Sequence, residues 1–174
     1  MELQTPATKC GRDRDWPSAA VVVRAAKDRG GRDIRLGGLS PNRVKVSARD
    51  TDGRVALFEY EGHGEGGPPL HVHDEQDEVF VVCAGRYLFQ VGEARRLLQA
   101  NDTIILPRGT PHSFRQLEAY GRLLFMLTPA GDMEGFFEAH ARLDASPDFP
   151  ALAPKLFADY GMRVVGPPIV GVKS

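Results

Sequence analysis

Three histidines and one glutamate have the residue types and the spacing of a metal site. His71 and His73 stand two positions apart, so in a β-strand both imidazoles point to the same face. Glu78 follows five positions after His73, an odd step that a straight strand would send to the opposite face. The polar segment 74–77 favours a turn, and we expect a hairpin there to return Glu78 to the two histidines.

A third histidine, His112, follows a turn, a short apolar strand and a corner rich in proline and glycine. Three neutral imidazoles and one carboxylate suit a divalent first-row metal ion and leave coordination positions open for a substrate. These donors do not name the ion; we favour iron, manganese or nickel, and cobalt, copper and zinc also fit. The alternative is a metal-free cluster of hydrogen-bonded side chains, in which each group left unpaired would cost about 1–3 kcal/mol.

The two segments resemble the paired motifs of the cupin superfamily, which are written G-x5-HxH-x4-E-x6-G and G-x5-PxG-x2-H-x3-N. The matching residues are His71, His73, Glu78 and Gly85 in the first motif and Pro107, Gly109 and His112 in the second. Three residues depart from the motifs: Glu65 and Asn101 stand where each motif has its leading glycine, and Gln116 replaces the closing asparagine. Asparagine tolerates the left-handed conformation, so the change at Asn101 is mild. The change at Gln116 affects only a contact in or behind the pocket.

The resemblance covers about residues 44–169 and implies an all-β fold, the double-stranded β-helix or cupin jelly-roll barrel, with short C-terminal helices. The approach 66–70 and the tail 166–169 are similar to those of single-domain, quercetin-dioxygenase-like cupins. For such a protein the resemblance implies one divalent transition metal held by the three histidines and Glu78, with dioxygen as co-substrate. It also implies a small aromatic or enol substrate, whose proton Glu78 would accept.

The cupin fold does not choose the reaction. A metal-dependent cyclase or isomerase on the same barrel would turn over without oxygen. A non-enzymatic barrel would bind a small molecule and release it unchanged. Our first hypothesis from the sequence is the oxygenase.

Composition excludes several classes of partner. The chain has 174 residues, enough for one domain with a sizeable core. Its 22 Lys and Arg residues nearly balance 23 Asp and Glu residues, so we expect neither a nucleic acid nor a membrane as partner. The two cysteines, Cys10 and Cys83, do not make a disulfide framework. Without a signal peptide or an apolar run long enough to span a bilayer, we expect a cytoplasmic protein that binds a small molecule.

We expect residues 1–20 to form a flexible arm and residues 21–174 to form a single barrel with a helical extension over about 132–161. The runs 21–23 and 34–36 are β-prone and predict the first strands. Cupin barrels commonly pair by strand exchange, and the run 21–23 is suited to it. We therefore expect a homodimer.

Further strands follow from alternation and turn residues. Segments 43–47 and 54–60 predict a hairpin, segments 87–91 and 95–99 predict a second one, and 123–127 and 162–165 predict a buried strand and an edge strand. Within 54–60 the pattern leaves the inward face open. Either Ala56, Phe58 and Tyr60 point into the barrel, or Val55, Leu57 and Glu59 do.

The period of two also predicts a substrate pocket. Its candidate residues are Phe58, Tyr60, Phe80, Val82, Phe114 and Gln116. Apolar walls of this kind exclude water and favour an aromatic ligand. The remaining histidines have simpler interpretations. His63 lies in a glycine-rich loop, where we expect it to be solvated, the alternative being an additional metal ligand or a substrate contact. His140 falls on a helix face after the N-cap Asp132.

Overall fold

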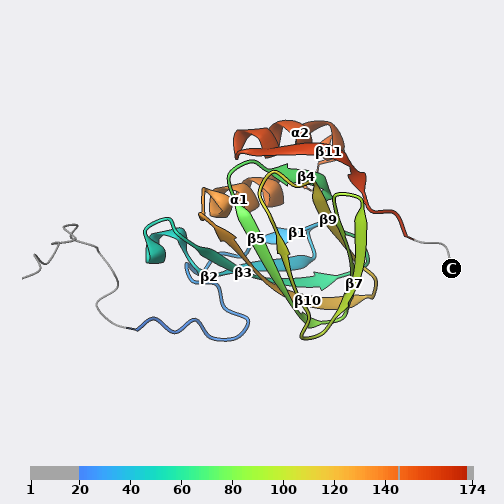
Figure 1. Ribbon diagram of the computed structural model, residues 1–174. Coiled ribbons are helices and arrows are strands. Elements are labelled where there is room, and N and C mark those ends of the chain that lie inside the picture. Colours follow the sequence, from blue (N-terminus) through green and yellow to red (C-terminus); the bar gives the residue numbers. More distant parts are fainter. Residues whose placement is uncertain (1–19, 145, 172–174) are drawn as a thin grey trace, which may run out of the picture.

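The computed structural model describes residues 20–144 and 146–171, which form two antiparallel sheets facing one another (Figure 1). The first sheet contains, in spatial order, β1 (Arg35–Leu36), β2 (Ser40–Val46), β3 (Ala56–His63), β10 (Tyr120–Thr128), β5 (Asp77–Ala84) and β8 (Thr103–Leu106). The second contains β11 (Met162–Pro168), β4 (Pro69–His73), β9 (His112–Gln116), β6 (Arg86–Val91) and β7 (Ala94–Gln99). This confirms the predicted all-β, double-stranded β-helix fold.

The core lies between the two sheets. Along β10, Leu123, Phe125 and Leu127 are buried and alternate with partly exposed residues, as expected for a strand with one face on the core. On the neighbouring β5, Phe80 and Val82 are buried on the same inner face. The inner faces of both sheets therefore carry the apolar residues that hold the barrel together.

The hairpin predicted before the metal motif is confirmed, since β2 pairs with β3. Phe58 is fully buried and stacks on Phe125, whereas Glu59 forms an ion pair with Arg43. Alternation along the strand then turns Ala56, Phe58 and Tyr60 to the interior. This decides between the two faces that the sequence left open.

Two helices follow the last long strand of the first sheet, α1 (Met133–Leu143) and α2 (Phe149–Asp159). The carboxylate of Asp132 accepts a hydrogen bond from the amide of Gly135, which confirms Asp132 as the N-cap of α1. After α2, β11 pairs with β4 as the predicted edge strand, and α2 lies over it (Figure 1). Among the described residues no helix is long and apolar enough to cross a membrane.

One predicted strand is wrong. Residues 21–23 form no strand, and Val21 and Val22 are 47% and 69% exposed. A β-prone run needs a partner strand to pair with, and none of the described strands pairs with this one. The run 34–36 does contribute a strand, the two-residue β1. The predicted flexible arm lies outside the described residues, apart from its last residue.

The turn at 74–77 does not close a hairpin, which corrects a second prediction. The strands on either side of it, β4 and β5, belong to different sheets and do not pair. The segment is a corner where the chain crosses from the five-stranded to the six-stranded sheet. Glu78 therefore faces the histidines from the opposite wall of the barrel.

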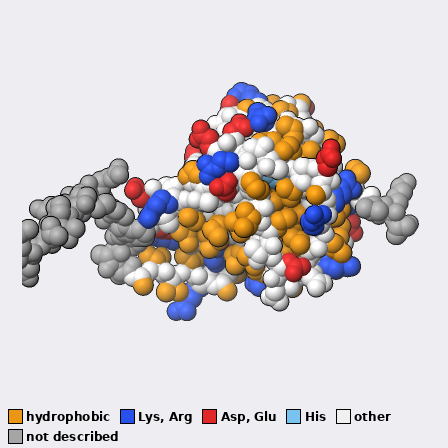
Figure 2. All heavy atoms as spheres, viewed as in Figure 1, with side chains coloured by type: hydrophobic (Ala, Val, Ile, Leu, Met, Phe, Trp, Pro, Cys, Tyr) orange, Lys and Arg blue, Asp and Glu red, His pale blue; other side chains and the backbone are white. Residues whose placement is uncertain are grey.

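Hydrophobic side chains gather over the middle of one face of the molecule, with acidic and basic side chains scattered around them (Figure 2). Three of the large exposed hydrophobic residues lie on edge strands, Leu97 on β7, Ile105 on β8 and Val165 on β11. A short 3-10 helix, η1 (Ala48–Thr51), connects β2 to β3.

Candidate metal centre

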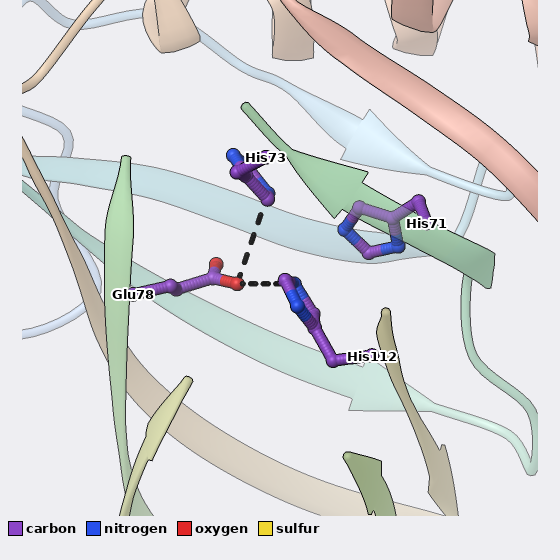
Figure 3. A group of neighbouring side chains, drawn as sticks. All are labelled: His71, His73, Glu78 and His112. Atoms are coloured by element: carbon purple, nitrogen blue, oxygen red, sulfur yellow. Dashed lines mark ion pairs between the residues drawn. The ribbon is translucent and has the colours of Figure 1, made fainter. Parts of the chain in front are cut away.

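His71, His73, Glu78 and His112 come together between the two sheets, and all four are buried. One ligand atom from each lies within 4.8 Å of those of the others. Figure 3 shows the carboxylate of Glu78 pointing toward the imidazoles of the three histidines. Four residues from three strands therefore converge on one point.

Strand pairing places the three histidines side by side. His71 and His73 lie two apart on β4, with ring centroids 5.2 Å apart. His112 is the first residue of β9 and lies directly opposite His71 in the register, with ring centroids 4.6 Å apart. Because β4 and β9 are neighbours, the alternation that turns His71 inward also turns His112 inward.

Glu78 reaches the histidines from β5 on the other wall. Its Oε2 lies 3.3 Å from Nε2 of His112 and 3.9 Å from Nε2 of His73. The corner before β9 is tied to both walls. The amide of Gly109 donates to the carbonyl of His73, and Arg108 forms an ion pair with Asp77 at the start of β5.

Two of the histidines are oriented by their own local backbone. Nδ1 of His71 lies 2.9 Å from the carbonyl oxygen of Pro69, and Nδ1 of His112 lies 2.8 Å from that of Thr110. A carbonyl oxygen can only accept, so each Nδ1 carries the proton. Each Nε2 then keeps a free lone pair, the form in which imidazole binds a metal.

His73 is oriented by a side chain, Gln76, which the sequence analysis treated only as a turn residue. Its Oε1 lies 3.0 Å from Nδ1 of His73, and its Nε2 donates to the carbonyls of Pro129 and Ala130. Those two donations fix which end of the amide accepts, so Nδ1 of His73 donates. The lone pair of its Nε2 is likewise free.

The atoms that face one another in the cluster, the three histidine Nε2 atoms and the carboxylate of Glu78, are all hydrogen-bond acceptors and share no donor hydrogen. Nε2 of His112 has no hydrogen-bond partner among the described residues, although it lies near Glu78. Burial, with the nearby His112 and His73, lowers the pKa of His71 to about 3, and burial also lowers the pKa of His73. Burial by itself would raise the pKa of Glu78, and the pKa is lowered only when positive charge stands beside it at His112 and His73. Three lone pairs and a carboxylate fit a cation better than a self-contained hydrogen-bonded cluster.

The cluster lies in the wall of a cavity of about 400 Å³. Three of the predicted pocket residues also line this cavity: Tyr60, Phe80 and Phe114. Further aromatic rings come from the two helices, among them Phe136 and Phe157. The ring of Phe157 packs edge-on against His71, with centroids 5.4 Å apart. The space next to the cluster is therefore largely apolar and aromatic.

The other three predicted pocket residues do not line the cavity. Phe58 is fully buried behind the wall, with its ring packed on Phe125 and Phe137. Val82 is buried in the interior of β5. The amide of Gln116 is occupied within the fold, because it donates to the carbonyls of Gly62 and Glu118 and accepts from the hydroxyl of Tyr87; these contacts tie β9 to its neighbours.

The two remaining described histidines lie outside the cluster. His63 is half-exposed, its Nε2 is 3.2 Å from Glu61, and it lines the cavity. His140 is packed on the inner face of α1 against Phe136 and Phe149, and burial lowers its pKa. Its Nδ1 lies 3.6 Å from Asp144. His140 agrees with its interpretation as a helix-face residue. His63 is half-exposed as expected, but it is the last residue of β3 and not part of a loop.

Residues 56–126 match the family model described as Cupin domain. No curated protein matches the chain. Among solved structures, KdgF from Halomonas sp. is 16% identical, with a TM-score of 0.50 over 55% of this chain and 83% of that one. A predicted oxalate decarboxylase from Thermotoga maritima is 14% identical, with a TM-score of 0.49 over 51% and 79%. The polyketide cyclase RemF from Streptomyces resistomycificus is 22% identical, with a TM-score of 0.46 over 52% and 65%.

At 16% identity the likeness to KdgF speaks for the fold alone. The match to the family model spans the whole four-residue cluster, from β3 to β10. Residues 56–126 therefore resemble the cupin domain, and the chain has the cupin fold.

Proposed function

We propose that this protein is a metal-dependent cupin oxygenase that acts on a small aromatic or enol substrate with dioxygen. The observation that carries the proposal is the tautomer of the three histidines. Each Nδ1 is engaged by an oxygen acceptor, so three Nε2 lone pairs and one carboxylate converge at the wall of an aromatic cavity. Such a donor set suits iron, manganese or nickel, with cobalt, copper and zinc also compatible.

His71, His73 and His112 would hold the ion through Nε2, and Glu78 through a carboxylate oxygen. When bound, the ion supplies Lewis acidity toward an enolate oxygen and the redox chemistry that dioxygen requires. It also explains how the fold tolerates a buried carboxylate facing unprotonated imidazole nitrogens.

The protein's own residues prepare the substrate. Glu78 is the only carboxylate in the cluster, and its Oε2 is placed to take the proton of an enol hydroxyl that enters beside it. Tyr60, Phe80 and Phe114 supply ring faces against which a flat substrate can stack. The same rings keep water away from the reacting atoms.

Oxygen uptake with an aromatic enol tests the proposal. The protein, reconstituted anaerobically in separate samples with Fe²⁺, Mn²⁺ or Ni²⁺, is mixed with a flavonol in an oxygen-electrode cell. We expect oxygen consumption that tracks loss of the flavonol, in the parent and in the control Gln99→Leu on the exposed side of β7, but not in His112→Ala. Substrate conversion without oxygen uptake would instead favour a cyclase or isomerase, and saturable binding without conversion would favour a binding protein. Either result would overturn the oxygenase.

A further inference from the structure

Asn42 on β2 is a buried polar residue whose amide is unpaired. The residue is 1% exposed, and neither Oδ1 nor Nδ2 has a hydrogen-bond partner among the described residues. It is also part of the cavity wall. Buried polar groups in folded proteins are almost always paired, so this amide is a candidate for binding whatever fills the cavity.

Gln116 shows the opposite case in the same barrel. It is also fully buried, but its amide donates to the carbonyls of Gly62 and Glu118 and accepts from the hydroxyl of Tyr87. An amide that serves the fold therefore has its partners within the protein. Asn42 has none of these contacts, so the fold does not explain its side chain.

Asn42 lies well away from the metal centre. In the first sheet β3 and β10 separate β2 from β5, which is about 14 Å across the sheet at the usual strand spacing. Residues paired across the sheet form a row that starts at Asn42, continues with Tyr60 on β3 and ends at Val82 on β5. Val82 lies four residues after Glu78 on the same strand. Both Asn42 and Glu78 nevertheless line the same cavity.

The wall between these two points is aromatic. Phe80, Phe114 and Phe125 all line the cavity, and the ring of Phe80 contacts the rings of the other two. The carboxylate of Asp144 also lines the cavity. Burial raises the pKa of Tyr60, the residue that pairs with Asn42, and the charge of Asp144 adds to this rise. An anionic ligand group is therefore disfavoured beside Tyr60.

We propose that Asn42 is a specificity-determining residue that binds a neutral hydroxyl or carboxamide group at the end of the substrate remote from the metal. The proposal rests on the proposed function and names the substrate class for the same cavity. That class is a molecule of two or three rings with a chelating enol at one end and a hydroxyl at the other, as in a polyphenol.

The chemistry of the amide selects such a group. Nδ2 of Asn42 donates and Oδ1 accepts, so a group that both accepts and donates satisfies the whole amide. A ketone or ether only accepts and would leave Oδ1 unpaired. A carboxylate also only accepts, and it would meet the charge of Asp144. Sites with buried polar groups reject ligands that leave those groups unpaired.

Ligand discrimination tests this role directly. The Ni²⁺-loaded protein is titrated calorimetrically, without oxygen, with quercetin and with 3-hydroxyflavone, which keeps the chelating hydroxyl and ketone but lacks the other hydroxyls. We expect the parent to bind quercetin at least about tenfold more tightly, which is the scale of one or two hydrogen bonds. Asn42→Leu removes the amide at similar size and should abolish this preference while binding 3-hydroxyflavone as the parent does. An unchanged preference in Asn42→Leu would overturn the proposal.

Thermal stability of the ligand-free protein gives a second test, which depends on neither metal nor turnover. If Asn42 serves a ligand, Asn42→Leu melts at the same or a higher temperature than the parent, whereas Gln116→Leu melts lower because it leaves paired groups unsatisfied. A drop in Asn42→Leu as large as that in Gln116→Leu would assign Asn42 to the fold and overturn the proposal. If only the proposed oxygenase activity is wrong, oxygen uptake will be missing. The parent will still prefer quercetin, and Asn42→Leu and Gln116→Leu will still differ in melting temperature as expected.

Discussion

Gln76 is the residue whose replacement separates orientation of a metal ligand from stability of the barrel. Its Oε1 accepts from Nδ1 of His73, and its Nε2 donates to the carbonyls of Pro129 and Ala130. The residue is buried. Gln76→Leu removes all three contacts at similar volume, whereas Gln76→Glu keeps an acceptor for His73 and loses both donations.

The expected magnitudes follow from these contacts. Residues that orient metal-binding histidines typically contribute about 10- to 100-fold to metal affinity, so Gln76→Leu should weaken Ni²⁺ binding by that factor. Gln76→Glu should keep the affinity, because a carboxylate partner raises the basicity of the imidazole. Both variants leave the buried carbonyl of Ala130 without this donor, which costs about 1–3 kcal/mol. For a domain of this size that lowers the melting temperature by about 2–12 °C.

Calorimetric titration of metal-free protein with Ni²⁺ measures the affinity, and thermal unfolding of the same samples measures the stability. Gln99→Leu, on the exposed side of β7, is the control and should change neither quantity by much. If Gln76→Leu bound Ni²⁺ as tightly as the parent, Gln76 would not orient His73. If Gln76→Glu lost affinity as severely as Gln76→Leu, the tautomer assigned to His73 would be wrong.

Three further predictions follow. Burial lowers the pKa of His71 from 6.5 to about 3, so between these two pH values His71 binds a proton in the unfolded chain but not in the folded one. Through this histidine the metal-free protein loses about 1.4 kcal/mol of stability per pH unit on acidification. Denaturant unfolding across this pH range should show the slope, and an equal slope in His71→Gln would contradict the assignment. A Cβ at Gly67 would overlap the carbonyl oxygen of Phe114, so Gly67→Ala should lose about 1–3 kcal/mol in denaturant unfolding; Gly171→Ala, where a Cβ meets only ordinary contacts, is its control, and equal stability of the two would refute the clash. We also propose a homodimer, for which the exposed β-prone segment 21–23 is a candidate exchange strand; light scattering should give twice the mass of one chain, and a monomer at micromolar concentration would contradict it.

Local sequence information was sufficient where one strand or one turn decides the geometry. The two-residue step from His71 to His73 places both imidazoles on one face, and the structure brings them together with Glu78 and His112. Asn101 adopts the left-handed conformation expected of a residue that stands in for glycine, with φ of 76°. Asp132 caps its helix as predicted. Each of these features depends on neighbours within a few positions.

Features that depend on distant segments were missed. The corner at 74–77 was interpreted as a hairpin, because nothing within it tells that β4 and β5 pair with strands far away in the sequence. Gln76 looked like a turn residue, since its carbonyl acceptors lie more than fifty positions away. Asn42 was not singled out, because only the register of β2 against β3 places it in the cavity wall.

Metal content tests the central claim most directly, that His71, His73, Glu78 and His112 form one metal centre. Elemental mass spectrometry is applied to untagged protein purified without chelator, for the parent, for His112→Ala and for the control His63→Ala. The account predicts about one transition-metal equivalent per chain in the parent and the control, and loss of the metal in His112→Ala. Absence of metal from the parent, even after anaerobic reconstitution with iron, manganese and nickel, would contradict it.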